Sequence, residues 1–289
     1  MLEIARLEAP FGVSAGGLDL SKPLEPEVVH ELLNALYANR VVVVPGQTLS
    51  PAEFGRYGSH FGRPHPHVLS IGRPPFIADH PAILPITNIT QDGAEPGYGA
   101  SHWHTDQSYD EEPSSATLLY ALQVPEKGGE TLFCDMVAAY DALPEGIASR
   151  IEGLVVKHLY GAGVALRADD IPTAPLQTDE QIEAAPMVYH PLVRPHPVTQ
   201  VKALYSLTGT SRGIVGMSDD EARDLLVQLA DHALQPRFCY AHRYEVGDVV
   251  VWDTAATLHK AAPSGRATGP ENTRFLYRIS VKGTPPSLQ

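Results

Sequence analysis

The chain has 289 residues, of which 43% are hydrophobic and 19% charged, so it can bury a sizeable core and has a globular rather than a disordered composition. Its formal net charge of −13 excludes a general nucleic-acid-binding surface, since binding phosphates needs a basic face. Two cysteines, an acidic start unlike a signal peptide and the lack of any apolar run of about 18 residues indicate a cytoplasmic protein with no membrane partner.

The first part of the chain predicts two amphipathic helices with a buried strand between them. Apolar residues recur at helical spacing over 27–39, and four consecutive valines follow at 41–44 before a Pro-Gly turn. Ser50 and Glu53 form a capping-box pattern with proline at the first helical position. We expect that second helix to end at Gly62.

The rest of the chain is dominated by predicted strands. A helix broken at Pro144 is expected over 136–153, and a second capping box at Ser218 opens a helix that runs to Leu234. The stretch 161–186 lacks any period, which is typical of a lid or a disordered loop. Strands are expected at 83–89, 116–122, 130–134, 154–160, 202–207, 238–244, 249–252 and 273–282.

These elements predict one domain over residues 1–289. Many strands with a few helices packed outside them favour an all-β core with flanking helices, a cupin-like jelly roll of two sheets.

Two histidines and an aspartate form the strongest candidate metal site. If residues 102–109 form a strand, His104 and Asp106 face the same side. His259 follows an apolar strand at a turn, and two imidazoles with one carboxylate are the ligand set of non-haem Fe(II) oxygenases. With 13 histidines in the chain, chance pairs are expected, but the aromatic and hydroxyl neighbours and a following arginine-bearing strand favour a metal site here. His102 shares this face and is interpreted as a pocket residue behind the ligands.

Arg274 and Arg278 stand four residues apart on the last predicted strand, so they face the same side. A buried face with two arginines is costly unless anions meet it, and planar guanidinium groups suit the carboxylates of a dianion. The alternative is an edge strand whose arginines face solvent. Arg266, in the preceding Gly/Pro-rich loop, is a weaker candidate for the same role.

Five motifs, in order along nearly the whole chain, resemble those of the taurine/2,4-dichlorophenoxyacetate dioxygenase (TauD/TfdA) family. The run 133–144 is similar to the herbicide-degrading branch. The other four are Trp103-His104-Thr105-Asp106, Pro125-x-x-Gly128-Gly129-Glu130-Thr131, His190-Pro191-Leu192-Val193-Arg194-x-His196-Pro197, and Trp252-Asp253 with His259.

The resemblance implies a double-stranded β-helix that holds Fe(II), with 2-oxoglutarate and O2 as co-substrates. His104, Asp106 and His259 match the family's metal ligands. Thr131 and Arg274 match the residues that hold the distal carboxylate of 2-oxoglutarate, and Arg278 the arginine nearer the metal and the substrate. Because Asp106 is retained where related halogenases have a small residue, the implied reaction is hydroxylation, or cleavage through an unstable hydroxylated intermediate, with succinate and CO2 as products.

The resemblance leaves the small-molecule substrate open. His67 matches a sulfonate-binding histidine of taurine dioxygenases, but Ser70 and Ala100 replace the family's tyrosine and asparagine, which argues against taurine. We expect an organic acid or a sulfonate, with a neutral biosynthetic intermediate as the alternative, and a possible homodimer or homotetramer by analogy. Further pocket candidates are Tyr98, His102, Tyr109, Arg167 and Arg212.

Two other classes of protein fit the metal motif alone. One is a cupin-like metal-binding protein without turnover, which has no need of Thr131 and the arginine pair. The other is a zinc hydrolase with water at the open position, for which Glu130 or Asp110 would have to act as the general base.

Overall fold

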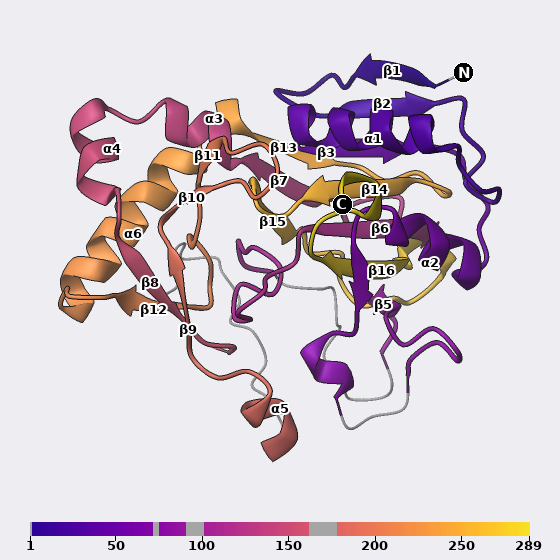
Figure 1. The fold of residues 1–289 in the computed structure, drawn as a ribbon. Helices are drawn as coiled ribbons and strands as arrows, with labels where there is room; N and C mark the ends of the chain where they lie inside the picture. The colour runs from indigo at the N-terminus through magenta and orange to yellow at the C-terminus, as the bar shows by residue number, and fades with distance from the viewer. Residues whose placement is uncertain (1, 72–74, 91–100, 162–177) are drawn as a thin grey trace.

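The computed structural model describes residues 2–71, 75–90, 101–161 and 178–289, which form a mainly β fold with flanking helices (Figure 1). Its largest sheet has eight strands in the order β1-β2-β3-β14-β6-β16-β4, with β5 also paired to β16. All pairs in this sheet are antiparallel except β2 with β3. The strands are β1 (Glu3–Arg6), β2 (Val13–Gly16), β3 (Val41–Val44), β4 (Arg63–His65), β5 (Leu84–Thr87), β6 (Ala116–Gln123), β14 (Val249–Asp253) and β16 (Phe275–Lys282).

A second, three-stranded antiparallel sheet packs on one face of the large sheet. Its order is β13 (Cys239–His242), β7 (Thr131–Asp135) and β15 (Thr257–Ala261). Phe133 on β7 is fully buried in one apolar cluster with Val250, Trp252 and Leu276 of the large sheet. The space between the two sheets is therefore filled by side chains from both of them.

Two helices, α1 (Pro26–Asn39) and α2 (Pro51–Ser59), cover the opposite face of the large sheet. On β14, Val249 and Val251 contact the helices while Val250 and Trp252 face the second sheet. This alternation explains why the strand is apolar at every position. The predicted capping box of α2 is confirmed, with Ser50 and Glu53 bonding reciprocally.

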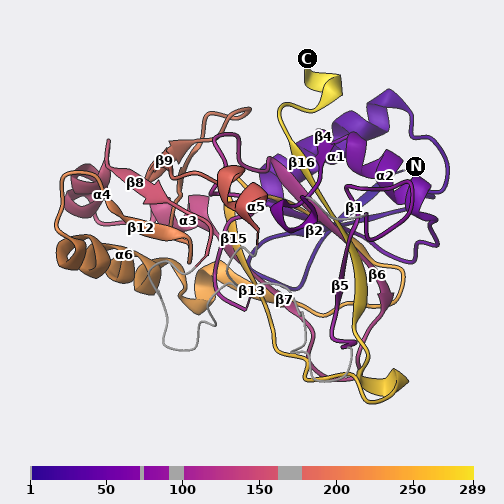
Figure 2. The ribbon, with the colours of Figure 1, turned by 90° about the horizontal axis from the view of Figure 1, so that it is seen from below.

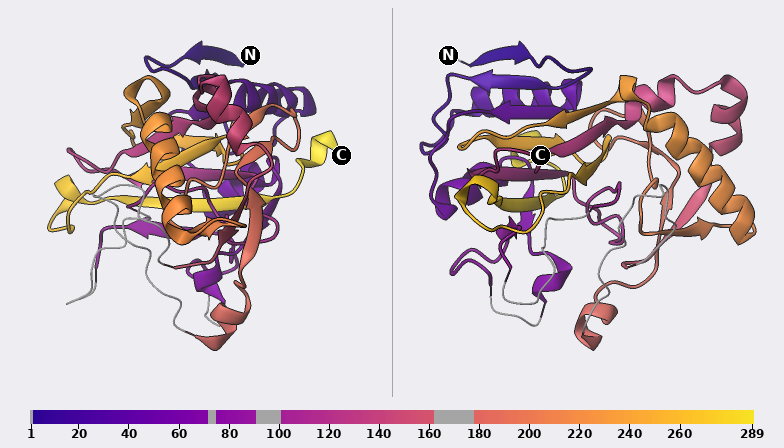
Figure 3. Two further views of the ribbon diagram at one scale, coloured as in Figure 1. Left: turned by 90° about the vertical axis from the view of Figure 1, so that its left-hand side faces the viewer. Right: turned by 180° about the vertical axis from the view of Figure 1, so that it is seen from behind.

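A third region lies at the end of the molecule remote from α1 and α2, as the views in Figures 2 and 3 agree. Leu225 and Leu229 of its longest helix pack with Val156, Ile214 and Leu258. The region comprises α3 (Met136–Asp141), α4 (Glu145–Ile151), α5 (Asp179–Glu183), α6 (Asp219–Ala233), β8 (Val155–His158), β9 (Val188–Pro191), β10 (Val193–Pro195), β11 (Lys202–Leu204) and β12 (Ser211–Ile214). Short 3-10 turns lie at Val68–Ser70, Pro236–Phe238, Pro270–Asn272 and Pro286–Leu288.

Most of the predicted elements are present, with differences. Helix α2 ends at Ser59 rather than at Gly62, and the strands β1, β2, β4, β9, β10, β12 and β15 were not predicted. The helix break at Pro144 and the helix after Ser218 are confirmed. Residues 102–109 do not form a strand: His104 makes a single β-bridge, and 106–109 form a turn. His259 lies within β15 rather than at a turn after a strand, because Thr257 to Ala261 pair along β7.

Both cysteines are free thiols. In the described part of the chain, no helix has the length and apolar character needed to cross a membrane.

Candidate metal centre and co-substrate site

A backbone bridge brings the two predicted metal-binding histidines together. The His104 N–H donates to the His259 carbonyl at 3.0 Å, and the His259 N–H donates to the His104 carbonyl at 2.9 Å. The two imidazole centroids are therefore only 4.0 Å apart. The His259 ring also packs 4.7 Å from the Trp252 ring, which restricts its orientation.

Asp106 completes a group whose donor atoms all lie within 4.8 Å of one another. Its two carboxylate oxygens lie 3.7 Å from His104 Nε2 and 3.5 Å from His259 Nε2. Two ligands at right angles on an octahedral metal lie about 3 Å apart, so small side-chain adjustments bring all three into bonding range. Asp106 Oδ2 is buried without a hydrogen bond, as expected of an oxygen that a cation satisfies. The three residues fit a metal ion.

His102 orients one of these imidazoles through its backbone. Its carbonyl oxygen lies 2.9 Å from His104 Nδ1, so Nδ1 carries the proton and Nε2 faces Asp106 with its lone pair. The His102 ring is buried against Gly209, where a Cβ atom would lie 2.5 Å from the ring. Only glycine fits there, and the His102 ring, 5.1 Å from that of His104, is not one of the three clustered donor residues.

The charges of the site suit a divalent cation. Burial, then the neighbouring His104, holds the pKa of His259 well below its usual value, so its ring is neutral. Burial raises the pKa of the Asp106 carboxyl, but the Arg278 guanidinium and the two imidazoles outweigh this and hold it well below its usual value. Metal ligation requires these protonation states, a neutral imidazole and an ionised carboxylate.

Arg274 and Thr131 belong to one buried polar cluster, in which Thr131 pairs with Ala261, two residues after His259 on β15. Arg274 is 1% exposed and its Nε donates to the Gly129 carbonyl at 2.9 Å. Its guanidinium lies 6.0 Å from the centre of the Tyr244 ring, whose hydroxyl shares a 2.9 Å hydrogen bond with Thr131. Gly129 has φ +77°, and a Cβ there would meet Arg274 Cδ at 3.1 Å, so the turn needs glycine.

Two members of this cluster were missed from the sequence. Burial raises the pKa of Tyr244 to about 12, so it remains a phenol; it was included only as the end of an apolar strand. Asn88 is fully buried and its Oδ1 accepts from the Arg274 N–H at 2.8 Å. Its amide donates to the carbonyls of Gly265 and Asn272, which ties the preceding loop to β16. The sequence placed Asn88 inside the expected strand 83–89, and a single asparagine there carries no signal for this role.

Arg278 and Arg266 have different places. Arg278 Nη2 lies 2.5 Å from Asp106 Oδ1, so the second arginine of the pair adjoins the metal-binding candidates. Arg266 is exposed on its loop. Arg274 is 1% exposed and the Arg278 side chain 11%, so the alternative of an edge strand whose two arginines face solvent is excluded.

Of the predicted substrate residues, two lie in one aromatic cluster, one borders that cluster, and two lie outside the described part of the chain. His67 lies 3.4 Å from the Tyr109 hydroxyl, and the Tyr109 and Tyr160 rings meet edge-on at 4.8 Å. Arg212 donates to the Tyr160 carbonyl at 3.4 Å, so it borders this cluster. Tyr98 and Arg167 lie outside the described residues.

The cluster around Tyr109 has an apolar wall. Tyr109 and Tyr160 pack with Val68 and Ala185, and Leu69 and Ile71 line the same cluster. Burial and the nearby Arg278 lower the pKa of His67 to about 3, so its ring is neutral. Most of the predicted lid, 162–177, lies outside the described residues, but Ala185 from its end packs on this wall.

A buried histidine connects the third region to the metal-binding segment. His158 is 0% exposed, and its two ring nitrogens lie 2.9 Å from the Ser206 hydroxyl and 3.2 Å from the Thr210 hydroxyl. Thr210 in turn shares a 2.8 Å hydrogen bond with Ser108, two residues after Asp106. Burial, then the neighbouring His190, lowers the pKa of His158 to about 3.

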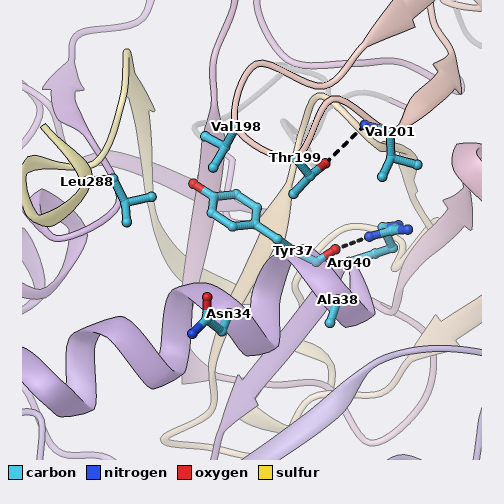
Figure 4. Close-up of a pocket in the computed structure, with 8 residues that line it drawn as sticks. All are labelled: Asn34, Tyr37, Ala38, Arg40, Val198, Thr199, Val201 and Leu288. Atoms are coloured by element: carbon cyan, nitrogen blue, oxygen red, sulfur yellow. Dashed lines mark hydrogen bonds between the residues drawn. The ribbon is translucent and has the colours of Figure 1, made fainter.

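A separate surface pocket of about 430 Å³ lies beside the end of α1 (Figure 4). Tyr37, Arg40, Val198 and Leu288 contribute to its lining. None of the three metal-binding candidates lines it, so it is not part of the metal centre.

The β fold and this donor set define a mononuclear non-haem iron oxygenase. The chain belongs to the taurine catabolism dioxygenase TauD, TfdA family, whose model matches residues 3–280. It is a 2-oxoglutarate-dependent non-haem iron dioxygenase that uses Fe(II), 2-oxoglutarate and O2. The alternatives of a non-catalytic metal-binding protein and a zinc hydrolase are thereby set aside. Asp110, a candidate general base for the hydrolase, instead forms an ion pair with Lys282 at 2.7 Å.

Several known proteins are similar over most of their length. Pentalenolactone F synthase of Streptomyces arenae is 32% identical over 281 residues, which cover 94% of this chain and 92% of the relative. The alpha-ketoglutarate-dependent 2,4-dichlorophenoxyacetate dioxygenase of Cupriavidus pinatubonensis is 32% identical over 259 residues, or 86% and 88%. A solved structure of AAD-2 in complex with Mn(II) and N-oxalylglycine is 31% identical, with a TM-score of 0.77 and 99% of each chain covered.

We expect His259→Ala to weaken Fe(II) binding by about 100-fold or more, because losing a ligand costs at least as much as losing one of its supporting groups. Anaerobic Fe(II) titration measures this. His30→Ala, on the exposed face of α1, serves as the control and should bind like the wild type. Equal affinities in the two variants would contradict the assignment.

The His158 imidazole predicts a pH dependence of stability. The unfolded chain binds a proton at this residue below about pH 6.5, whereas the folded protein does so only near pH 3. The contribution of His158 to the free energy of unfolding is therefore fully present above pH 6.5. As the pH falls from 6.5 toward 3, this free energy decreases by up to about 1.4 kcal/mol per pH unit.

Urea unfolding between pH 4 and 6.5 should accordingly show a shallower pH dependence for His158→Gln than for the wild type. His30→Gln is the matched control and should keep the wild-type slope. The same slope in all three proteins would show that His158 does not stay neutral in the fold.

Proposed function

We propose that this dioxygenase oxidises an aliphatic C–H group of a small organic acid that carries an aromatic or other apolar body. The observation that carries the proposal is the position of Arg278, which pairs with the Asp106 carboxylate and also interacts electrostatically with Tyr109 and Tyr160 of the apolar wall. Relatives named for 2,4-dichlorophenoxyacetate and (S)-phenoxypropionate act on compounds of this kind, which supports it.

We assign the metal-binding role to His104, Asp106 and His259, which would hold Fe(II) through two Nε2 atoms and a carboxylate. The bound iron, 2-oxoglutarate and O2 supply the oxidising chemistry that puts oxygen on the C–H carbon and releases succinate and CO2. The protein's share is to hold the reactants in place and to keep the buried site dry.

Arg274 and Thr131 would bind the distal carboxylate of 2-oxoglutarate. Burial lowers the pKa of Arg274, but arginine remains protonated in proteins, and a buried cation needs an anion or several acceptors. A planar guanidinium presents two parallel N–H donors to a carboxylate. Thr131 adds a hydroxyl that Tyr244 orients through its 2.9 Å hydrogen bond.

Arg278 would bind the carboxylate of the primary substrate. The structure gives one of its N–H groups to Asp106, and the guanidinium has further donors for a second anion. The neutral His67 beside Tyr109 offers a hydrogen bond without adding charge. An acid headed toward Arg278 would place its apolar part against the aromatic wall.

The proposal extends to the architecture. The two packed sheets are assigned to a double-stranded β-helix within a single domain over 1–289, and the lid expected over 161–186 stays a prediction. A homodimer or homotetramer and a cytoplasmic location stay predictions.

The co-substrate assignment predicts that Arg274→Gln raises the dissociation constant of 2-oxoglutarate about 30-fold or more. Loss of one partner of a buried charged hydrogen bond costs about 2 kcal/mol or more. The absorbance of the anaerobic Fe(II)–2-oxoglutarate complex reports the titration. Arg266→Gln removes the exposed arginine of the neighbouring loop and should bind 2-oxoglutarate normally; the reverse ranking would move the anchor to that loop.

A panel of matched acids and neutral analogues tests the substrate class. Phenoxyacetate and 2-phenoxypropionate should stimulate succinate formation from 2-oxoglutarate about tenfold or more over the substrate-free rate, whereas phenoxyacetamide should not, because it has no charge for Arg278. Alkyl sulfonates test the alternative anion. The proposal would be overturned if the amide stimulated succinate formation as strongly as the acid, or if none of the acids stimulated it.

A further inference from the structure

The cationic face of β16 carries one more basic residue after Arg278, namely Lys282. Arg278 and Lys282 stand four residues apart on β16, so they lie on the same face of the strand, and Arg274 stands four residues before Arg278, just ahead of the strand. Arg278 pairs with Asp106, and Lys282 Nζ lies 2.7 Å from Asp110 Oδ2. Two ion pairs therefore connect β16 to Asp106 and Asp110, the first and last residues of the segment 106–110 that follows His104.

The Lys282–Asp110 pair is largely shielded from water, with Lys282 buried and Asp110 partly buried. Its side chains are only 7% and 16% exposed, respectively. Moving two charges out of water costs about as much as their attraction returns, and apolar pairs of similar volume are often as stable. Net stability is thus a weak reason for this pair, whereas fixing one arrangement of the chain is an attested role of buried polar pairs.

Other contacts fix the same turn from further directions. The Asp110 N–H donates to the Gln107 carbonyl at 2.9 Å, and the Asp110 carbonyl lies 2.9 Å from His190 Nε2. Gln107 adopts φ +52°, a conformation unusual for a residue with a side chain, and its amide accepts from the Ser114 hydroxyl. Ser108 is held by Thr210.

Tyr109 is the residue of this turn that reaches the proposed substrate wall. It lies directly before Asp110, is 5% exposed, and points its hydroxyl at His67. Its ring meets Tyr160 edge-on. Any rotation of the turn would move this ring while leaving Arg274, just before β16, and Thr131, at the start of β7, in place.

We propose that Lys282 and Asp110 form a positioning pair, which fixes the turn 107–110 and through it the place of Tyr109 in the substrate pocket. Among the described residues, the hydrogen bonds and ion pairs of these two side chains do not reach the three metal-binding candidates or the Arg274 cluster. The role in the pocket rests on the function proposed above, whereas the control of the turn does not.

Hydrogen–deuterium exchange of the anaerobic Fe(II)–2-oxoglutarate complex tests the pair. In Lys282→Met, peptides covering 104–114 should exchange about tenfold faster than in the wild type, while peptides covering 131–135 and 257–261 keep the wild-type rate. The Fe(II)–2-oxoglutarate absorbance should form with unchanged affinity. Lys202→Met breaks an exposed pair with Glu152 and should leave every peptide unchanged.

Two further variants separate positioning from the cost of an unpaired charge. Lys282→Arg keeps a cation and should restore slow exchange. The double variant Asp110→Asn with Lys282→Met leaves no unpaired buried charge, so it folds even if the single variant does not, and its 104–114 peptides should still exchange fast. Wild-type exchange in the double variant would overturn the proposal.

An acid that stimulates the wild type gives the functional readout. Lys282→Met should raise the KM for that acid about tenfold, with a smaller change in kcat and an unchanged KM for 2-oxoglutarate. If no acid stimulates the wild type, the proposed substrate class fails, and the exchange measurement still decides whether the pair holds the turn. Equal KM values for the acid in both proteins would overturn its role in the pocket.

Discussion

The metal centre depends on one pair of backbone hydrogen bonds. His104 and His259 exchange N–H···O=C contacts at 3.0 and 2.9 Å, and this places their imidazoles next to each other without any help from side-chain chemistry. His259 is itself fixed because β15 pairs along β7, and β7 is pressed against the large sheet by Phe133. The position of the two candidate histidine ligands is therefore a consequence of how two sheets pack.

A single strand, β16, supplies the charges that complete the site. It pairs with β6 along its length, and its apolar face, with Ile279 and Val281, packs toward the helices. Its other face directs Arg278 at Asp106 and Lys282 at Asp110. Buried cations are tolerated there because each of these two meets a carboxylate, and Arg274, just before the strand, donates to the Gly129 carbonyl. The same strand thus joins the core to the site, which makes the geometry of the site as rigid as the sheet.

Much of the candidate site followed from residue types and spacing. Metal ligation demands imidazole and carboxylate, and a dianion demands arginine, so His104, Asp106, His259, Arg274 and Arg278 were identifiable from chemistry and from the family's motifs. Tyr244, Asn88 and Tyr160 were not, because a phenol, an amide or an aromatic ring has many structural uses and no distinctive spacing. Their roles arise from contacts between segments far apart in the chain.

By itself, the sequence determined the local elements and the chemical class of the site. Capping boxes at Ser50 and Ser218 and the apolar alternation of the strands are local properties, since they depend on neighbours within a few residues. Only the tertiary structure decided that the segment after His104 is a turn rather than a strand, because one bridge to His259 replaces a ladder there. It also decided which cation meets which carboxylate, since strand pairing and sheet packing, not sequence spacing, set the distances between side chains from separate elements.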